Sequence, residues 1–183
     1  VPTLLQMLHR GEAEGLDGFV FEIRVTDLGA DVEAFAACVR RVLCAISDCD
    51  PTGERSARKS YVGDRSWHFV FARFPIFVTT FAPCYGTNSS RFTYDADPHS
   101  VFILLQPEYS FLRHDLPADT PHTAWNQPRT IRDRIRVSFR NAGQPYEIPA
   151  TVHYPASEHI VKPLEVGQPA IRWWQTPGDE QNI

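Results

Sequence analysis

The stretch VFILLQ at residues 101–106 constrains the fold more than any other part of the chain. Its side chains are apolar at successive positions, so both faces of a strand formed here need cover. A strand with two apolar faces is typical of the centre of a sheet, where neighbouring strands also satisfy its backbone groups. The stretch therefore predicts a sheet with residues 101–106 in its interior.

Other strand-forming runs supply neighbours for that strand. Residues 19–25, FVFEIRV, alternate so that their apolar side chains share one face. Two more runs, residues 67–73 and 76–81, are separated by Phe74 and Pro75. We expect a tight hairpin or a bent crossing at these two residues.

Helices are predicted at two places. Apolar residues between Asp31 and Ile46 recur at spacings of three and four, which indicates one face of an amphipathic helix. Thr130 and Asp133 resemble a capping box that opens a helix running to about Arg140. Residues 47–60 are polar and broken by proline and glycine, so we expect a loop there.

The remainder of the chain carries prolines at positions 145, 149, 155, 163, 169 and 177, which favours an extended, wrapping segment. We therefore predict the α+β class, with a single domain over residues 1–183. It would combine a mainly antiparallel sheet, a few flanking helices and an extended, proline-rich C-terminal segment.

The composition limits the kinds of partner that we expect. With 18 basic and 22 acidic side chains the net charge is -4, which gives no general reason to expect nucleic acid as a partner. No apolar run reaches the roughly 20 residues that cross a bilayer, and the first residues show no signal pattern. We expect a cytoplasmic protein with no membrane partner. Adjacent tryptophans at 173 and 174 in an extended segment favour a homodimer contact.

The stretch FAPCYGTNSSR at residues 81–91 places Cys84 at a strand end. This cysteine is a candidate for packing, for a nucleophile or for a metal ligand. Backbone N–H groups of residues 85–87 are expected to point at the sulfur and favour the thiolate. Haem iron accepts such a thiolate as its axial ligand. His99 and His114 flank the central strand and its successor, so either is an alternative ligand or a proton carrier.

A second candidate feature is a stripe of arginines. The side chains recur at spacings of three and four along the predicted helix, at Arg129, Arg132, Arg136 and Arg140. One interpretation is a binding site for carboxylates or phosphates, including haem propionates, because arginine binds such groups bidentately. In the alternative interpretation, the guanidinium groups of this stripe are paired with neighbouring carboxylates or hydrated by water.

Several short elements between Trp67 and Phe111 together resemble the YqcI/YcgG family. They are Pro75-Ile76-Phe77-Val78, Ala82-Pro83-Cys84, Ser90-Arg91 and Leu105-Gln106-Pro107, and the later Ile131-Arg132 looks like the family's I-R element. The family carries a histidine near the position of Cys84. The resemblance implies haem, because characterised members are haem-dependent oxygenases that N-hydroxylate arginine-type guanidines in natural-product pathways.

The resulting hypothesis is a haem b-dependent oxygenase of the mono-oxygenase or peroxygenase type. It would oxidise the nitrogen, or another position, of an amino-acid-like amine or guanidine, with a reductant or peroxide as co-substrate. Cys84 would be the axial ligand, with His99 and His114 as alternatives, and Glu108 would pair with the cationic substrate while His114 carries protons. The residues expected to hold the cofactor are Trp67, Arg91, Arg132 and Arg136.

Two other classes of function stay open. A cofactor-free enzyme would use a Cys84 thiolate, activated by a histidine, to attack an acyl or similar electrophile. A non-catalytic protein would bind haem or another small molecule without turning it over.

Overall fold

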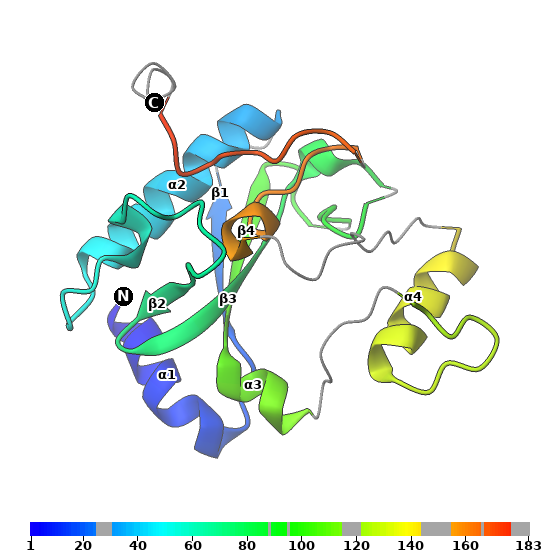
Figure 1. Cartoon of the computed structure of the whole chain (residues 1–183), viewed down its shortest axis with the longest axis horizontal. Helices are drawn as coiled ribbons and strands as arrows, with labels where there is room; N and C mark the ends of the chain where they lie inside the picture. The colour runs from blue at the N-terminus through cyan, green and yellow to red at the C-terminus, as the bar shows by residue number, and fades with distance from the viewer. Residues whose placement is uncertain are drawn as a thin grey trace.

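The computed structural model describes residues 1–24, 31–87, 89–94, 96–114, 122–143, 155–165 and 167–176. Within these residues it has four α-helices and a four-stranded antiparallel sheet in the order β1-β4-β3-β2 (Figure 1). The predicted α+β class with a mainly antiparallel sheet is confirmed. Residues 144–154, 166 and 177–183 of the predicted C-terminal segment lie outside the described residues.

The central strand is β4 (Ser100–Pro107), which pairs with β1 (Phe19–Arg24) on one edge and β3 (Phe74–Phe81) on the other. This confirms the interior position predicted from its two apolar faces. β1 also follows the predicted alternation, although Val25 lies outside the described residues.

One face of the sheet carries the main core. Helices α1 (Pro2–Glu14) and α2 (Val32–Asp48) contribute to the same buried cluster as the inward side chains of β3 and β4. The predicted second helix is confirmed and runs on to Asp48, and the Asp31 carboxylate caps it by accepting a bond from the Ala34 amide at 2.6 Å. α1 was not predicted.

The opposite face of the sheet is half open. Its outward side chains include Val20 and Phe77, which are 53% and 41% exposed. The short helix α3 (Glu108–Arg113) follows β4 directly and packs Phe111 edge-on against Phe77, with ring centroids 5.6 Å apart. Helix α3 therefore covers one end of this face, and this is where a pocket forms.

The hairpin between β2 (Phe69–Phe71) and β3 turns at Ala72 and Arg73, so the turn predicted at Phe74-Pro75 is wrong. Both turn residues have positive φ angles, 52° and 68°, as the favoured two-residue hairpin turns require. The buried carboxylate of Asp50 stabilises this conformation, because it accepts a bond from the Ala72 amide at 3.2 Å. A contact from a residue so distant in sequence does not show in a local pattern.

The loop predicted at residues 47–60 is partly wrong as well. Its first residues belong to α2, and Ser56–Arg58 form the short 3₁₀ helix η1. The Ser56 hydroxyl donates to the Val70 carbonyl at 2.8 Å, which attaches this segment to β2.

The C-terminal segment covers the edge of β3. β2 pairs with β3 only as far as Ile76. The backbone groups along the rest of that edge of β3 need other partners. The segment that includes η3 (Ala156–His159) lies there, and the Thr80 hydroxyl donates to the Ile160 carbonyl. The buried Arg91 donates to the Thr80 carbonyl at 3.0 Å and to the His159 carbonyl at 3.1 Å.

The remaining helix, α4 (Ile131–Asn141), lies apart from the sheet (Figure 1). Its predicted capping is confirmed, since the Thr130 hydroxyl accepts a bond from the Asp133 amide at 3.0 Å. No helix within the described residues combines the length and apolar character that a bilayer crossing requires.

The two adjacent tryptophans pack against other residues of the same chain. Trp173 is 2% exposed, and its indole N–H donates to the Ser157 carbonyl at 2.9 Å. Trp174 is half-buried beside Gly63. Trp173 is thus already covered within the chain, Trp174 is covered in part, and the homodimer contact at these residues stays a prediction.

We predict that Asp50→Ala lowers the free energy of unfolding by about 2 kcal/mol, because the buried Ala72 amide loses its acceptor. The Asp50 carboxylate also accepts from the Thr52 amide and hydroxyl, each at 2.8 Å. Urea unfolding measures the loss, with Asp64→Ala at an exposed site as the control. Equal losses in the two variants would contradict a special role for Asp50.

We also predict that Arg91→Ala lowers the free energy of unfolding by about 3 kcal/mol, since hydrogen bonds from a charged donor are stronger than neutral ones. Urea unfolding again measures this effect. Arg172→Ala, at an exposed arginine of the same C-terminal segment, is the matched control. A loss no larger than that of the control would show that Arg91 does not hold the segment on β3.

Candidate functional site

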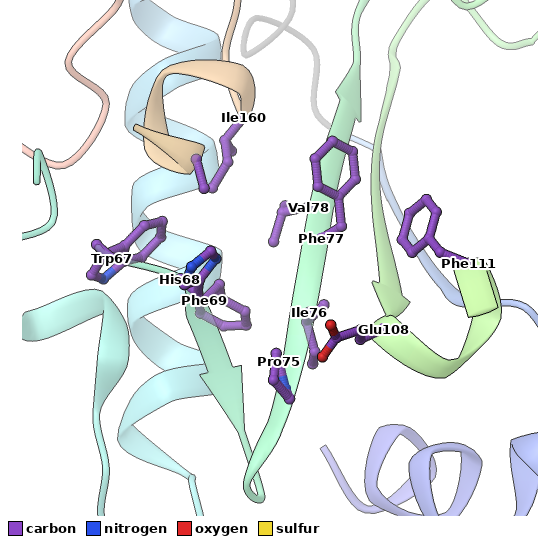
Figure 2. A pocket seen from close by; sticks show the side chains of 11 residues that line it. Trp67, His68, Phe69, Pro75, Ile76, Phe77, Val78, Glu108, Phe111 and Ile160 are labelled. Atoms are coloured by element: carbon purple, nitrogen blue, oxygen red, sulfur yellow. The ribbon is translucent and has the colours of Figure 1, made fainter. Parts of the chain in front are cut away.

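A pocket of about 320 Å³ opens where β2 stops pairing with β3. Its walls come from the β2–β3 hairpin, the start of α3 and the segment around η3 (Figure 2). Pockets that hold small organic ligands begin at about this size. The described residues thus include a cavity suited to a small molecule.

The walls are mainly apolar. Aromatic side chains line the pocket at Trp67, Phe69, Phe77 and Phe111. The Trp67 ring is held in place because its N–H donates to the Ser56 carbonyl at 2.9 Å. Ile76 and Val78 of β3 and Ile160 of the C-terminal segment add aliphatic surface.

Two ionisable side chains interrupt this apolar lining, Glu108 and His68. Glu108 is the first residue of α3, where a carboxylate is stabilised by the helix dipole. Figure 2 shows its carboxylate reaching toward Pro75 and Ile76, across the pocket from the His68 ring. A cationic or hydrogen-bonding ligand would therefore meet one anionic group and one imidazole between aromatic rings.

The structure brings only some of the predicted site residues together. Trp67 and Glu108 both line the pocket. The other predicted residues do not line it: Cys84, Arg91, His99, His114, Arg132 and Arg136.

The thiolate expected at Cys84 stays a prediction, and the surroundings of the sulfur favour the protonated thiol. The pKa of the Cys84 thiol is raised to about 11, mainly by burial and in part by the nearby charges of Asp31 and Glu33, and a backbone hydrogen bond to the sulfur offsets some of this rise. The amide of Tyr85 donates to the Ala82 carbonyl at 3.3 Å, and that of Gly86 donates to the Pro83 carbonyl at 3.1 Å. These donors close the 3₁₀ turn η2 (Pro83–Tyr85) instead of stabilising a negative sulfur.

The alternative ligands lie elsewhere. His99 is exposed just before β4. His114 lies at the end of α3, where its imidazole contacts the Asp17 carboxylate at 2.8 Å. The bond to His114 is also the largest cause of the lowered pKa of Asp17. This pair joins α3 to the chain before β1, and neither residue lines the pocket.

The predicted propionate-binding arginines are separated in space. Arg91 is committed to two backbone carbonyls beside β3. Arg132 and Arg136 belong to α4, where the buried Arg136 lies 3.9 Å from the Asp133 carboxylate. In the same helix, Arg140 stacks over the Trp125 ring at 4.6 Å. Two arginines of the stripe therefore have a carboxylate or an aromatic ring as a local partner, in line with the alternative interpretation.

Haem bound as predicted requires its axial ligand and propionate partners at one cavity. Cys84, Arg91 and α4 do not meet at the pocket, so this predicted set does not fit haem there. Within the described ranges, no group of three or more His, Cys, Asp or Glu side chains is placed to hold a metal ion. Haem binding by the chain stays a prediction.

Sequence reasoning missed His68, Phe77 and Phe111 as site residues. One signal was available: Phe77 is an aromatic residue at a position of β3 that faces outward, where a polar residue is expected. An exposed aromatic on a strand marks a possible binding surface.

Comparison of the chain with models of protein families, with curated proteins and with solved structures finds no match.

We predict that Cys84 reacts slowly with a disulfide reagent such as DTNB at pH 8. A thiol with a pKa of about 11 is ionised in roughly one molecule in a thousand at that pH, and the thiolate is the reactive form. The exposed Cys49 should give the only fast phase. In Cys49→Ser this phase should vanish; a fast phase that instead vanishes in Cys84→Ser would refute the buried-thiol assignment.

Proposed function

We propose that this protein binds a small molecule with an amine or guanidine group in the pocket between the β2–β3 hairpin, α3 and η3. The observation that carries the proposal is the Glu108 carboxylate at the rim of a mainly apolar, aromatic pocket, across from the His68 ring. A carboxylate beside apolar surface favours a cationic partner over a neutral one.

The aromatic lining supports the same class of ligand. Rings attract cations through their faces and also bury apolar groups, so Phe77 and Phe111 suit a molecule that combines both properties. The acidic Glu108 then orients the charged end, and the apolar part lies against Ile76 and Val78. An amino-acid-like amine with a hydrophobic or planar body fits this description.

The raised pKa of Cys84 favours binding at this pocket over the alternative of a cysteine nucleophile, because the protonated thiol is a poor nucleophile. The same feature gives no support to thiolate ligation of iron. Oxidation of the bound amine stays a further proposal that depends on haem and rests on the resemblance to the YqcI/YcgG family. A cytoplasmic location stays a proposal too.

An absorption spectrum after addition of hemin tests the haem hypothesis directly. A Soret band that shifts in Cys84→Ala or His114→Ala would support ligation by the predicted residues. A spectrum identical to that of unbound hemin would leave only the binding proposal.

We predict that Glu108→Gln weakens the binding of 4-phenylbutylamine about three- to tenfold. The carboxylate is exposed on one side, so the lost attraction corresponds to about 1 kcal/mol. Titration calorimetry measures the change, with the neutral alcohol 4-phenylbutanol as the matched probe. Its affinity should be the same for both proteins.

Two controls make this test specific. Glu165→Gln changes an exposed carboxylate outside the pocket and should leave the binding of both probes unchanged. Phe77→Ala should weaken both probes, because each loses the same aromatic contact. If Glu108→Gln lowers the affinities of amine and alcohol equally, the carboxylate does not select the cation and the proposal fails.

A further inference from the structure

The pocket beside Glu108 runs along one edge of β3, the edge that faces away from β4. Four consecutive residues of the strand line it, from Pro75 to Val78. Side chains of a strand alternate between its two faces, so a cavity that touches four residues in a row lies beside the strand. Figure 2 shows the side chains of Phe77 and Val78 leaving β3 in different directions. The backbone groups of this edge therefore form part of the pocket wall.

The β2–β3 hairpin determines which residues of β3 direct their backbone groups toward this edge. Its two-residue turn makes Phe71 and Phe74 a hydrogen-bonded pair, and such pairs recur at every second residue of an antiparallel ladder. Phe69 and Ile76 are the next pair, at the last position that β2 reaches. The following residue of the series is Val78.

Contacts elsewhere on β3 agree with this alternation. The Thr80 carbonyl accepts a bond from the Arg91 guanidinium at 3.0 Å, and the Ala82 amide donates to the Arg91 carbonyl at 3.0 Å. On the other side of the strand Ile76 lies opposite Pro107, which has no N–H to donate. Every second residue from Ile76 onward therefore directs its N–H and C=O away from β4.

The amide and the carbonyl of Val78 have no partner on this edge among the described residues. β2 stops pairing one step earlier, and no hydrogen bond of the C-terminal segment reaches Val78. Val78 is nevertheless only 3% exposed. Buried backbone groups are nearly always hydrogen-bonded, so a donor and an acceptor side by side in a pocket wall favour a ligand that supplies both partners.

The position of Glu108 sets the direction of such a ligand. Its carboxylate lies toward Pro75 and Ile76, which precede Val78 along β3 (Figure 2). A peptide whose terminal ammonium meets this carboxylate therefore runs parallel to β3. In a parallel pair, one residue bonds to the two residues that flank its opposite neighbour.

We propose that the pocket binds the first three residues of an extended peptide, which adds to β3 as a parallel strand. The Val78 amide donates to the carbonyl of the first peptide residue, and the amide of the third residue donates to the Val78 carbonyl. The peptide ammonium faces Glu108, so this inference rests on the amine site proposed above. The first side chain lies on the same face as Phe77, and the amide of the second residue points away from β3.

The test uses the peptide Phe-Ala-Ala-amide and two N-methylated forms of it, with affinities measured by titration calorimetry. Methylation of the third residue removes the N–H that donates to Val78 and should weaken binding about tenfold. Methylation of the second residue removes an N–H that points away and should change the affinity by about twofold or less. Equal affinities of the three peptides, or a loss confined to the second position, would overturn the proposal.

An acetylated peptide separates this inference from the proposed function. Acetylation of the N-terminus removes the ammonium but keeps both bonds to Val78, so it should weaken binding to the wild-type protein and have little effect in Glu108→Gln. If acetylation leaves the wild-type affinity unchanged, the amine site fails. If acetylation weakens binding but the methylated peptides bind alike, only strand addition fails.

Amide hydrogen exchange, followed by NMR, reports on the strand itself. Saturating Phe-Ala-Ala-amide should slow exchange of the Val78 amide about tenfold or more, because that amide gains a hydrogen bond. The Thr79 amide faces β4 and is the matched control, whose rate should change much less. The probe 4-phenylbutylamine has no carbonyl and should protect neither amide. An unchanged Val78 rate in the peptide-bound protein would refute the proposed pairing.

Discussion

The buried guanidinium of Arg91 is the interaction on which the rest of the structure depends. A buried charge is tolerated only when hydrogen bonds replace its lost hydration. Arg91 obtains two of them from the carbonyls of Thr80 and His159, the latter 68 residues further along the chain. One side chain thus joins the edge of the sheet to the C-terminal segment. That segment takes the place of another strand along β3 and completes the core with Ile160, Val161 and Trp173.

The pocket is a consequence of this arrangement. β2 is short and leaves β3 after Ile76, and the described residues of the C-terminal segment approach β3 without forming a strand. The space between them is lined by residues from three distant parts of the chain, near positions 67–78, 108–111 and 156–160. The carboxylate among these described residues, Glu108, belongs to the first residue of α3, directly after the central strand.

Local patterns predicted the elements well and their assembly poorly. The two apolar faces of β4, the spacing in α2 and the capping at Thr130 are properties of short segments, so the sequence alone revealed them. The hairpin turn was misplaced because it depends on Asp50, which lies more than 20 residues away. The ionisation of Cys84 is equally hard to read from a local pattern, because it depends on burial and on the acidic start of α2. Of the site, Glu108 and Trp67 were singled out, but nothing local indicated that His68 and Phe111 would line the same pocket.

Ala156 and Ile160 form part of the pocket wall, so binding of the proposed ligand would depend on the attachment of the C-terminal segment. A molecule that binds only when this wall is present stabilises the attached form, by an amount set by its concentration relative to its dissociation constant. The equilibrium works in both directions, since any change that loosens the C-terminal segment also lowers the apparent affinity. Protease resistance of residues 155–176 would therefore rise with ligand concentration and report occupancy of a cavity that the protease never contacts.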